Sequence, residues 1–142
     1  MSLSRRALLA LPLAACSRKK ASGFPGYAFV ANEEGKAVAA VDLTAVAVVK
    51  HLRLDAAPSA VLVSTSRPAA YILTPETGSV HEISTDNLSA TGQIRAGQKA
   101  LSMWMAPDGS ALYVVCREPR QLTRIALNPL RVEWKMPLPG EP

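Results

Sequence analysis

The sequence predicts an all-β fold built from repeated four-stranded antiparallel sheets. The chain repeats itself with a period of about 42 residues, and each repeat contains four short apolar runs separated by turn-forming residues. No segment between these breaks is long enough for a helix of useful length. The repeats begin at Ala28, Ala70 and Leu112, which gives the units 28–69, 70–111 and 112–142.

The repeat is visible as columns of apolar residues that recur at the same place in each unit. The first column is aromatic and holds Phe29, Tyr71 and Tyr113. Further apolar columns keep the same register: Val38, Val80 and Leu122; Val41, Ile83 and Ile125; Leu52, Ile94 and Met136. Because every column is a packing position, the repeat predicts an architecture and no particular chemistry.

Each of the four runs is predicted to be a strand. In the second unit the runs and the turns between them alternate as follows: runs 70–73, 80–83, 90–94 and 102–105, with turns 75–78, 84–87 and 97–99. The fourth run ends before Asp108-Gly109, which is a strong tight-turn signal. In the first unit Val38 and Val41 are three residues apart, as in a helix, but Gly35 and the strand-length spacing favour a strand.

The third and fourth runs differ in their predicted exposure. The third run of the last unit alternates between apolar and charged residues: Val132, Trp134, Met136 and Leu138 against Glu133 and Lys135. This alternation is typical of a perimeter strand with one buried and one wet face. The fourth run, represented by 61–63 and 103–105, is apolar on both faces and is predicted to be an inner strand.

Four-stranded units of about 40 residues that repeat radially are the blades of a β-propeller. Three segments resemble the YVTN-type β-propeller repeat: 27–32 (YAFVAN) its first strand, 57–64 (APSAVLVS) its P-x-x-I-A-V-S strand, and 106–109 (APDG) its S-P-D-G turn. In later units Thr74 and Cys116 stand where the family has Asn. The resemblance covers residues 27–142 and implies a seven-bladed ring of the YncE-like or lactonase-like kind.

The 142 residues provide eleven predicted strands, or about two and three-quarter blades of a partial propeller. Nothing before Tyr27 reads as an inner strand, so the first blade is expected to have three strands. Each end of such an arc would expose a face of roughly 300 Å², near the largest apolar patch of a typical monomer. We therefore expect further blades or self-association to close the ring. A fragment of a longer chain is the leading explanation, followed by an assembly of arcs and by a small stable domain.

The N-terminus is predicted to be an export signal. Arg5 and Arg6 precede an apolar stretch at 7–15, and residues 13–16 (LAAC) resemble a bacterial lipobox. Such a stretch is too short to span a membrane, which takes about 20 residues. Residues 1–15 are thus predicted to be a lipoprotein signal peptide, Cys16 the lipidated residue and 16–26 a tether, which places the chain on the bacterial cell envelope. The alternative is an uncleaved tail with an incidental cysteine.

Residues 4–9 (SRRALL) also resemble a twin-arginine export motif, which leaves that route and ordinary secretion both open. The net charge of +5 comes from the basic residues before the repeats: Arg5, Arg6, Arg18, Lys19 and Lys20. From Ala21 onward, basic and acidic residues balance. YncE-like relatives have been linked with DNA, but a neutral arc does not favour nucleic acid as a partner.

The remaining reactive side chains do not form a catalytic or metal-binding motif. If Cys16 carries lipid, Cys116 is a lone thiol, predicted to be a small, partly buried side chain, with intermolecular pairing as the alternative. His51 and His81 lie in different predicted strands and are predicted to be surface histidines. The sequence contains no Gly-x-Ser-x-Gly elbow, calcium loop or haem-attachment motif, so no catalytic residue, metal or cofactor is predicted.

One polar column could carry binding. Glu34, Glu76 and Glu118 occupy equivalent loops and should point to the same face of the disc. Blades pack about 10 Å apart, so two of these carboxylates cannot share a calcium ion at about 2.4 Å. An acidic rim for a cationic partner and ordinary solvated carboxylates are the two interpretations, and Arg117 and Arg120 beside Glu118 weaken the first.

These observations favour a non-catalytic binding or scaffold module that presents its loops to a protein, glycan or small-molecule ligand. The alternative is a lactonase-type hydrolase. For that class the family resemblance implies acidic, Arg and His groups on loops over the central channel, and this chain has no His on those loops. The sequence does not name a ligand.

Overall fold

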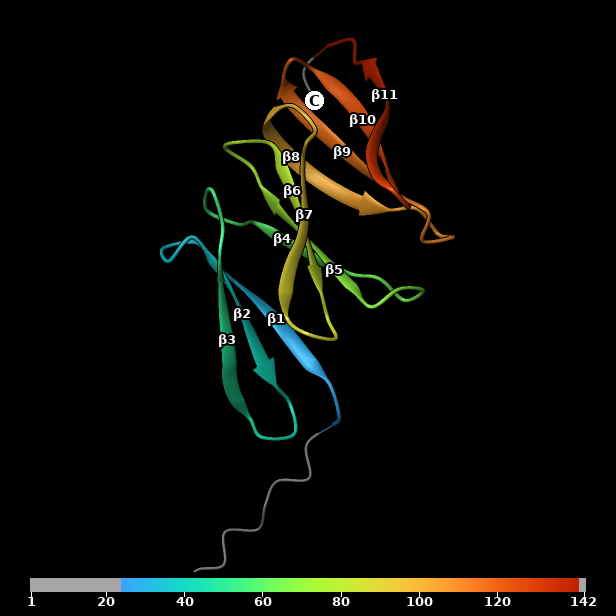
Figure 1. The fold of residues 1–142 in the computed structure, drawn as a ribbon. Coiled ribbons are helices and arrows are strands. Elements are labelled where there is room, and N and C mark those ends of the chain that lie inside the picture. Colours follow the sequence, from blue (N-terminus) through green and yellow to red (C-terminus); the bar gives the residue numbers. More distant parts are fainter. Residues whose placement is uncertain (1–23, 141–142) are drawn as a thin grey trace, which may run out of the picture.

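The computed structural model describes residues 24–140 and contains strands and turns only (Figure 1). The predicted signal peptide, the lipidation site Cys16 and most of the tether lie outside the described residues. Eleven strands follow one another along the chain: β1 (Tyr27–Asn32), β2 (Ala37–Asp42), β3 (Ala47–Arg53), β4 (Ala60–Val63), β5 (Ala69–Thr74), β6 (Ser79–Ser84), β7 (Ser89–Arg95), β8 (Gln98–Met105), β9 (Ala111–Glu118), β10 (Gln121–Leu127) and β11 (Leu130–Pro137).

The strands form three antiparallel sheets in which each strand pairs with its neighbour in sequence. The first sheet is β1-β2-β3, the second is β4-β5-β6-β7 and the third is β8-β9-β10-β11. Figure 1 shows the twisted sheets succeeding one another from the first to the last. The predicted fold class is confirmed: an all-β chain of four-stranded antiparallel sheets, the first with three strands, which is a partial propeller.

The sequence period holds in three dimensions. Strands β1, β5 and β9 start at Tyr27, Ala69 and Ala111, which are equally spaced along the chain, and β2, β6 and β10 keep the same spacing. The stretch from 37 to 42 is a strand, as Gly35 and the run spacing indicated. One predicted turn is partly wrong, because β8 already begins at Gln98, where the chain has reached the edge of the third sheet.

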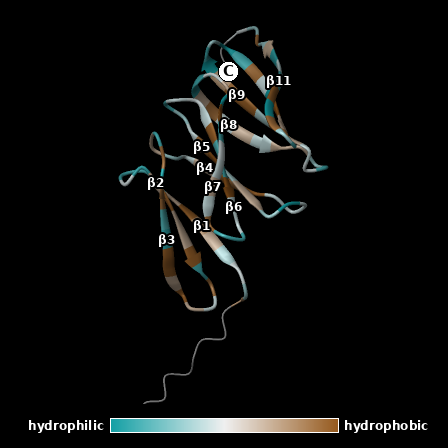
Figure 2. Cartoon of the chain, in the orientation of Figure 1, coloured by the Kyte–Doolittle hydropathy of each residue, from teal (hydrophilic) through white to brown (hydrophobic). Residues whose placement is uncertain are grey.

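The sheets pack face to face, and the junction between the second and third sheets is the larger. Its fully buried side chains come from both sheets: Tyr71, Leu73, Val80, Leu112, Val114, Ile125 and Leu127. Burial of each such side chain stabilises the fold by about 1.5–3 kcal/mol. The junction between the first and second sheets buries Val38, Ile72 and Ile83. In Figure 2 the hydrophobic residues follow the strands and the turns are mostly hydrophilic.

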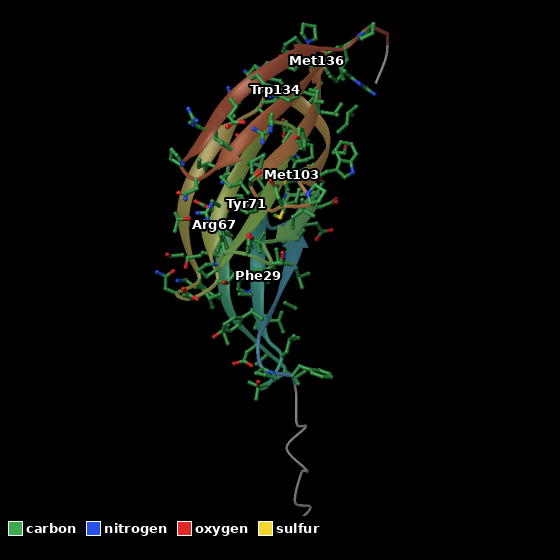
Figure 3. The ribbon with its side chains drawn as sticks, turned by 90° about the vertical axis from the view of Figure 1, so that its right-hand side faces the viewer. Phe29, Arg67, Tyr71, Met103, Trp134 and Met136 are labelled. Atoms are coloured by element: carbon green, nitrogen blue, oxygen red, sulfur yellow. The ribbon has the colours of Figure 1, made fainter. Side chains whose placement is uncertain are left out.

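The third sheet has an open face opposite this core. Trp104 is opposite Tyr113 in the strand register, and Arg124 is opposite both Tyr113 and Trp134. Trp104 is 53% exposed, Trp134 41% and Met136 46%. Figure 3 labels Trp134 and Met136 along β11. The prediction that Trp134 and Met136 belong to a buried face is wrong, because no sheet within residues 24–140 covers this side.

The inner-strand prediction is also only partly correct. β4 and β8 lie at one edge of their sheets, as expected. Their apolar side chains are nevertheless not buried on both faces, since Val63 and Trp104 are each 53% exposed. An edge strand has a neighbour on one side only, so part of its apolar surface stays in contact with solvent.

Candidate functional site

The predicted acidic column lies at the end of each repeat where a loop joins its first two strands. Glu34 and Glu76 are exposed in their loops, and Glu118 is the last residue of β9. The ammonium group of Lys99 forms an ion pair with the Glu118 carboxylate. Glu76 lines a cleft of about 300 Å³ together with Lys99 and Arg117. The rim is therefore of mixed charge, and cation capture by the three carboxylates stays a prediction.

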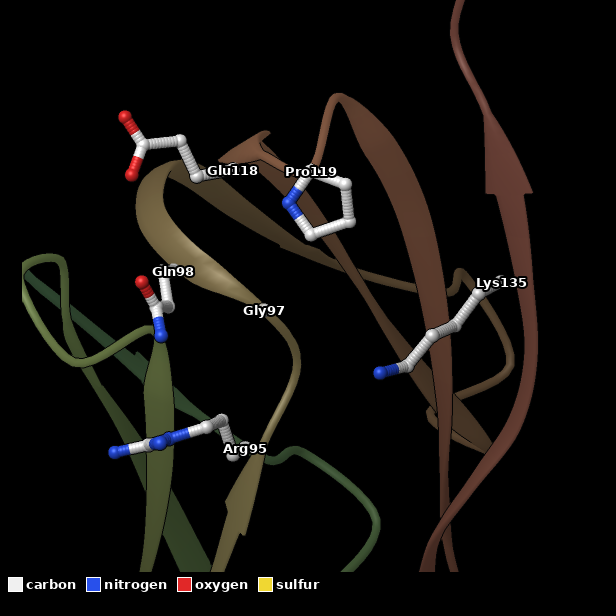
Figure 4. A pocket seen from close by; sticks show the side chains of 6 residues that line it. All are labelled: Arg95, Gly97, Gln98, Glu118, Pro119 and Lys135. Carbon is white, nitrogen blue, oxygen red and sulfur yellow. The ribbon is translucent and has the colours of Figure 1, made fainter.

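A larger cleft of about 450 Å³ lies between the second and third sheets at this same loop end, and we call it the junction cleft (Figure 4). It is lined by Arg95, Gly97, Gln98, Glu118, Pro119 and Lys135. Figure 4 shows the Lys135 side chain extending from β11 toward the segment that carries Gly97. The cleft thus joins residues from two sheets with one of the predicted loop carboxylates.

The floor of the junction cleft is the short connection from β7 to β8. The backbone N–H of Ala96 donates to the carbonyl oxygen of Gly78 at 2.8 Å. The carbonyl oxygen of Ala96 accepts from Gln121 Nε2 at 2.8 Å and from Thr123 Oγ1 at 3.1 Å. Gln121 and Thr123 are themselves buried in the third sheet, so the floor is fixed on both sides.

Close packing below Gly97 tightens this floor further. A Cβ atom on Gly97 would lie 2.8 Å from Cys116 Sγ and 2.9 Å from Cys116 Cβ. Cys116 has no exposed surface, so it is more buried than the partial burial predicted from its place at a strand end. Burial raises the pKa of its thiol, and the nearby ammonium of Lys135 opposes that rise. Cys116 is a packing residue beneath the cleft.

The two histidines differ in their environment. His51 is exposed on β3, as predicted. The prediction for His81 is wrong, because His81 is only 7% exposed and its Nε2 lies 2.9 Å from Asp55 Oδ1. Its column faces the adjacent sheet rather than solvent, and Asp55 comes from the connection between the first two sheets. Gln93 Nε2 donates to the other Asp55 oxygen at 3.0 Å, so this carboxylate anchors the connection to the second sheet.

The Asp55 anchor predicts a defined dependence of stability on acid. Burial raises the pKa of the carboxyl, but hydrogen bonds with His81, Thr77 and Thr74 outweigh burial and hold the pKa at about 2, against an ordinary 3.8. A lowered pKa stabilises the native state above the ordinary pKa, and this contribution disappears as the pH falls from about 4 to about 2. We expect about 1 kcal/mol, since the side chain is partly exposed.

The measurement is the urea midpoint of Asp55→Asn and of the wild-type chain at several pH values between 5 and 2. The difference between the two chains should shrink as the pH falls through this window. Asp86→Asn, in the exposed turn between β6 and β7, is the matched control. A constant difference across the window would contradict the role of the ionised Asp55.

A second polar cluster lies at the opposite end of the large junction. Glu82 is 9% exposed, and it accepts from Tyr71 Oη at 3.1 Å and from Thr91 Oγ1 at 3.1 Å. Arg67 pairs with the same carboxylate at 3.5 Å and also donates to the carbonyl oxygen of Leu127. Burial, with Glu82 beside it, raises the pKa of Tyr71 to about 12. Every polar group here has a partner, which suits a structural role.

The sequence alone does not reveal the junction cleft. It predicts Lys135 on the wet face of a perimeter strand, and Arg95 has the same pattern, so each residue looks like an ordinary surface cation. The one available signal for the cleft is that Arg95 and Lys135 occupy similar places in successive repeats, separated by nearly one period. Within residues 24–140, no group of three or more His, Cys, Asp or Glu side chains could hold a metal ion. The same residues include no helix long and apolar enough to cross a membrane.

Comparison with known proteins identifies the fold. No protein-family model matches the chain, and no curated protein matches it. A chain of hydrazine synthase from Kuenenia stuttgartiensis matches with a TM-score of 0.74 and 17% identity over 92% of this chain. The dihydro-heme d1 dehydrogenase NirN matches with a TM-score of 0.75 and 17% identity over 81% of this chain. A putative 6-phosphogluconolactonase from Bacteroides uniformis matches with a TM-score of 0.68 and 19% identity over 80% of this chain.

These structures are β-propeller-type proteins. Because their sequence identity to this chain is at most 19%, the likeness shows the fold alone. The present chain spans 40%, 25% and 38% of the three matched chains, respectively. The likeness therefore supports blades of a propeller, and it transfers neither a reaction nor a ligand.

Proposed function

We propose that this protein is an exported, lipid-anchored β-propeller repeat protein of YVTN type that acts as a non-catalytic binding module at the bacterial cell envelope. The junction cleft supports this role most directly. Its fixed floor and charged walls lie at the loop end of two sheets, which is where a repeat protein can present side chains to a partner. The N-terminal lipobox-like sequence would hold that surface close to the membrane.

Lipid attachment at Cys16 is the first test of this proposal. The full chain expressed in a bacterial host with a labelled fatty acid should incorporate label, because Cys16 ends a lipobox-like segment after a basic n-region. Cys16→Ser should abolish the label, whereas Cys116→Ser should retain it, since Cys116 is buried in the third sheet. Equal labelling of the Cys16→Ser chain would exclude lipid attachment at this residue.

Capture of a cationic partner by the loop carboxylates is the second test. Replacing Glu34, Glu76 and Glu118 together by Gln should reduce binding to a cationic peptide column at low salt and flatten its salt dependence. Asp42 ends β2, Asp86 and Asp108 lie in turns, and the triple Asn variant of these three residues is the charge-matched control. If both triple variants elute at the same salt concentration, the carboxylates are solvated loop residues.

A lactonase-type hydrolase is the second candidate, and the similarity to the putative 6-phosphogluconolactonase is the observation in its favour. In that case the present residues would be blades of an enzyme, and the chain should open sugar lactones faster than buffer alone. Hydrolysis that exceeds the buffer rate and persists in repeated purifications would favour this candidate over a binding module.

A further inference from the structure

We infer that the junction cleft binds a small organic dianion, such as a phosphate monoester, between Arg95 and Lys135. This inference gives a ligand class to the proposed binding role and rests on it. The cleft is a built feature of the packed second and third sheets, and it shares only Glu118 with the acidic column that the sequence indicated.

The first argument is the state of the cations. Arg95 ends β7 on the second sheet, and Lys135 belongs to β11 on the third. Across the part of the chain that the structure describes, neither side chain has an ion-pair partner. The acidic residue of the cleft, Glu118, is already neutralised by Lys99. An anion that enters the cleft therefore meets two uncompensated positive charges from two sheets.

The second argument is the fixed backbone beneath the two cations. Arg95 directly precedes Ala96, whose carbonyl oxygen is held by Gln121 and Thr123. Lys135 is opposite Thr123 in the strand register, so it stands on the same face of the third sheet as this anchor. The backbone beneath both cations is thus fixed, so binding does not require the sheets to rearrange. It requires only rotation of the Arg95 side chain, which extends away from Lys135 in Figure 4.

The third argument is size and polarity. A volume of about 450 Å³ falls within the range of small-molecule sites. The amide of Gln98 has no hydrogen-bond partner among the described side chains and can donate to a ligand oxygen. Gly97 and Pro119 supply an apolar surface for the carbon part of the ligand. A phosphate or dicarboxylate on a short carbon chain fits these three features.

The experiment titrates the full chain with glycerol 3-phosphate, with inorganic phosphate and with glycerol, and measures heat release and backbone amide shifts. We expect saturable binding of glycerol 3-phosphate, weaker binding of inorganic phosphate and none of glycerol. Shifts should concentrate at Gly97 and Gln98. Lys135→Gln and Arg95→Gln should each weaken binding about tenfold, the usual effect of removing one charge-assisted hydrogen bond, and the double variant should abolish it.

Lys50→Gln and Arg53→Gln are the matched controls, because both residues are exposed cations of β3 and Arg53 lies one period before Arg95. Thermal midpoints of all variants verify folding, and Lys135→Met serves if Lys135→Gln is poorly folded. Absence of saturable binding to both phosphate probes would overturn the inference, as would equal affinity in the double variant and in the controls. Either failure would leave lipid attachment at Cys16 and capture by the loop carboxylates to be judged by their own tests.

Discussion

The segment from residue 21 to residue 142 is expected to self-associate and to bind a hydrophobic dye. Trp104, Trp134 and Met136 lie on the open face of the third sheet and are 53%, 41% and 46% exposed. On the second sheet the equivalent face is covered, since Tyr71 is fully buried there whereas its counterpart Tyr113 is not. Burial of each large side chain between copies contributes about 2 kcal/mol, so removal of one should weaken association about thirtyfold.

Light scattering and dye fluorescence measure this association directly. The double variant Trp134→Lys with Met136→Glu should scatter less and bind less dye than the unmodified segment. Leu43→Lys is the control, because Leu43 is 38% exposed in the turn after β2 and outside the open face. A monodisperse unmodified segment that unfolds cooperatively and binds no dye would show that three sheets suffice and that the open face needs no cover.

Gly78→Ala should cause the largest loss of stability of any single substitution proposed for this chain. Gly78 has a φ of 62°, and a Cβ atom there would lie 2.2 Å from the carbonyl oxygen of Gly97. The clash is with the backbone of the connection that forms the cleft floor, so no side-chain rotation relieves it. Strain at positive φ and overpacking each cost about 1–3 kcal/mol, which predicts a loss of about 3 kcal/mol or more.

Gly140→Ala is the matched control for this substitution. Gly140 has a φ of 77°, and a Cβ atom there would meet nothing within 4 Å. Gly140→Ala should lower the stability only through backbone strain at positive φ, by about 1 kcal/mol. Urea unfolding of the two variants separates strain from clash, and equal midpoint shifts would contradict the tight contact between Gly78 and the floor.

The strand pattern and its period could be predicted from the sequence because they depend on local information. Phe29, Tyr71 and Tyr113 recur at one constant interval, and turn-forming residues separate the apolar runs between them. Pairing is between strands that are adjacent in sequence, so it involves no long-range choice of partner. This is why the sheets lie where the columns predict, with boundaries shifted by a few residues.

The covering of each face could not be predicted in the same way. Alternation along a strand shows which side chains share a face, but it does not show whether another sheet lies against that face. The pattern thus places His81 at the surface although Asp55 meets it at a sheet junction, and it places Trp134 in the interior although its face is open. The junction cleft escapes prediction for the same reason, since Arg95 and Lys135 come from different sheets.

Strict pairing between consecutive strands also bears on how such a chain could have grown. No strand in the described range crosses over to pair with a distant one. A duplication of one repeat unit, inserted in a connection between two sheets such as β3–β4 or β7–β8, would therefore add one sheet and leave all existing strand pairs intact. The only new requirement is one more junction between faces that already fit each other. Divergence after duplication is then free to alter single junction residues, as the column of Ala39, His81 and Thr123 shows.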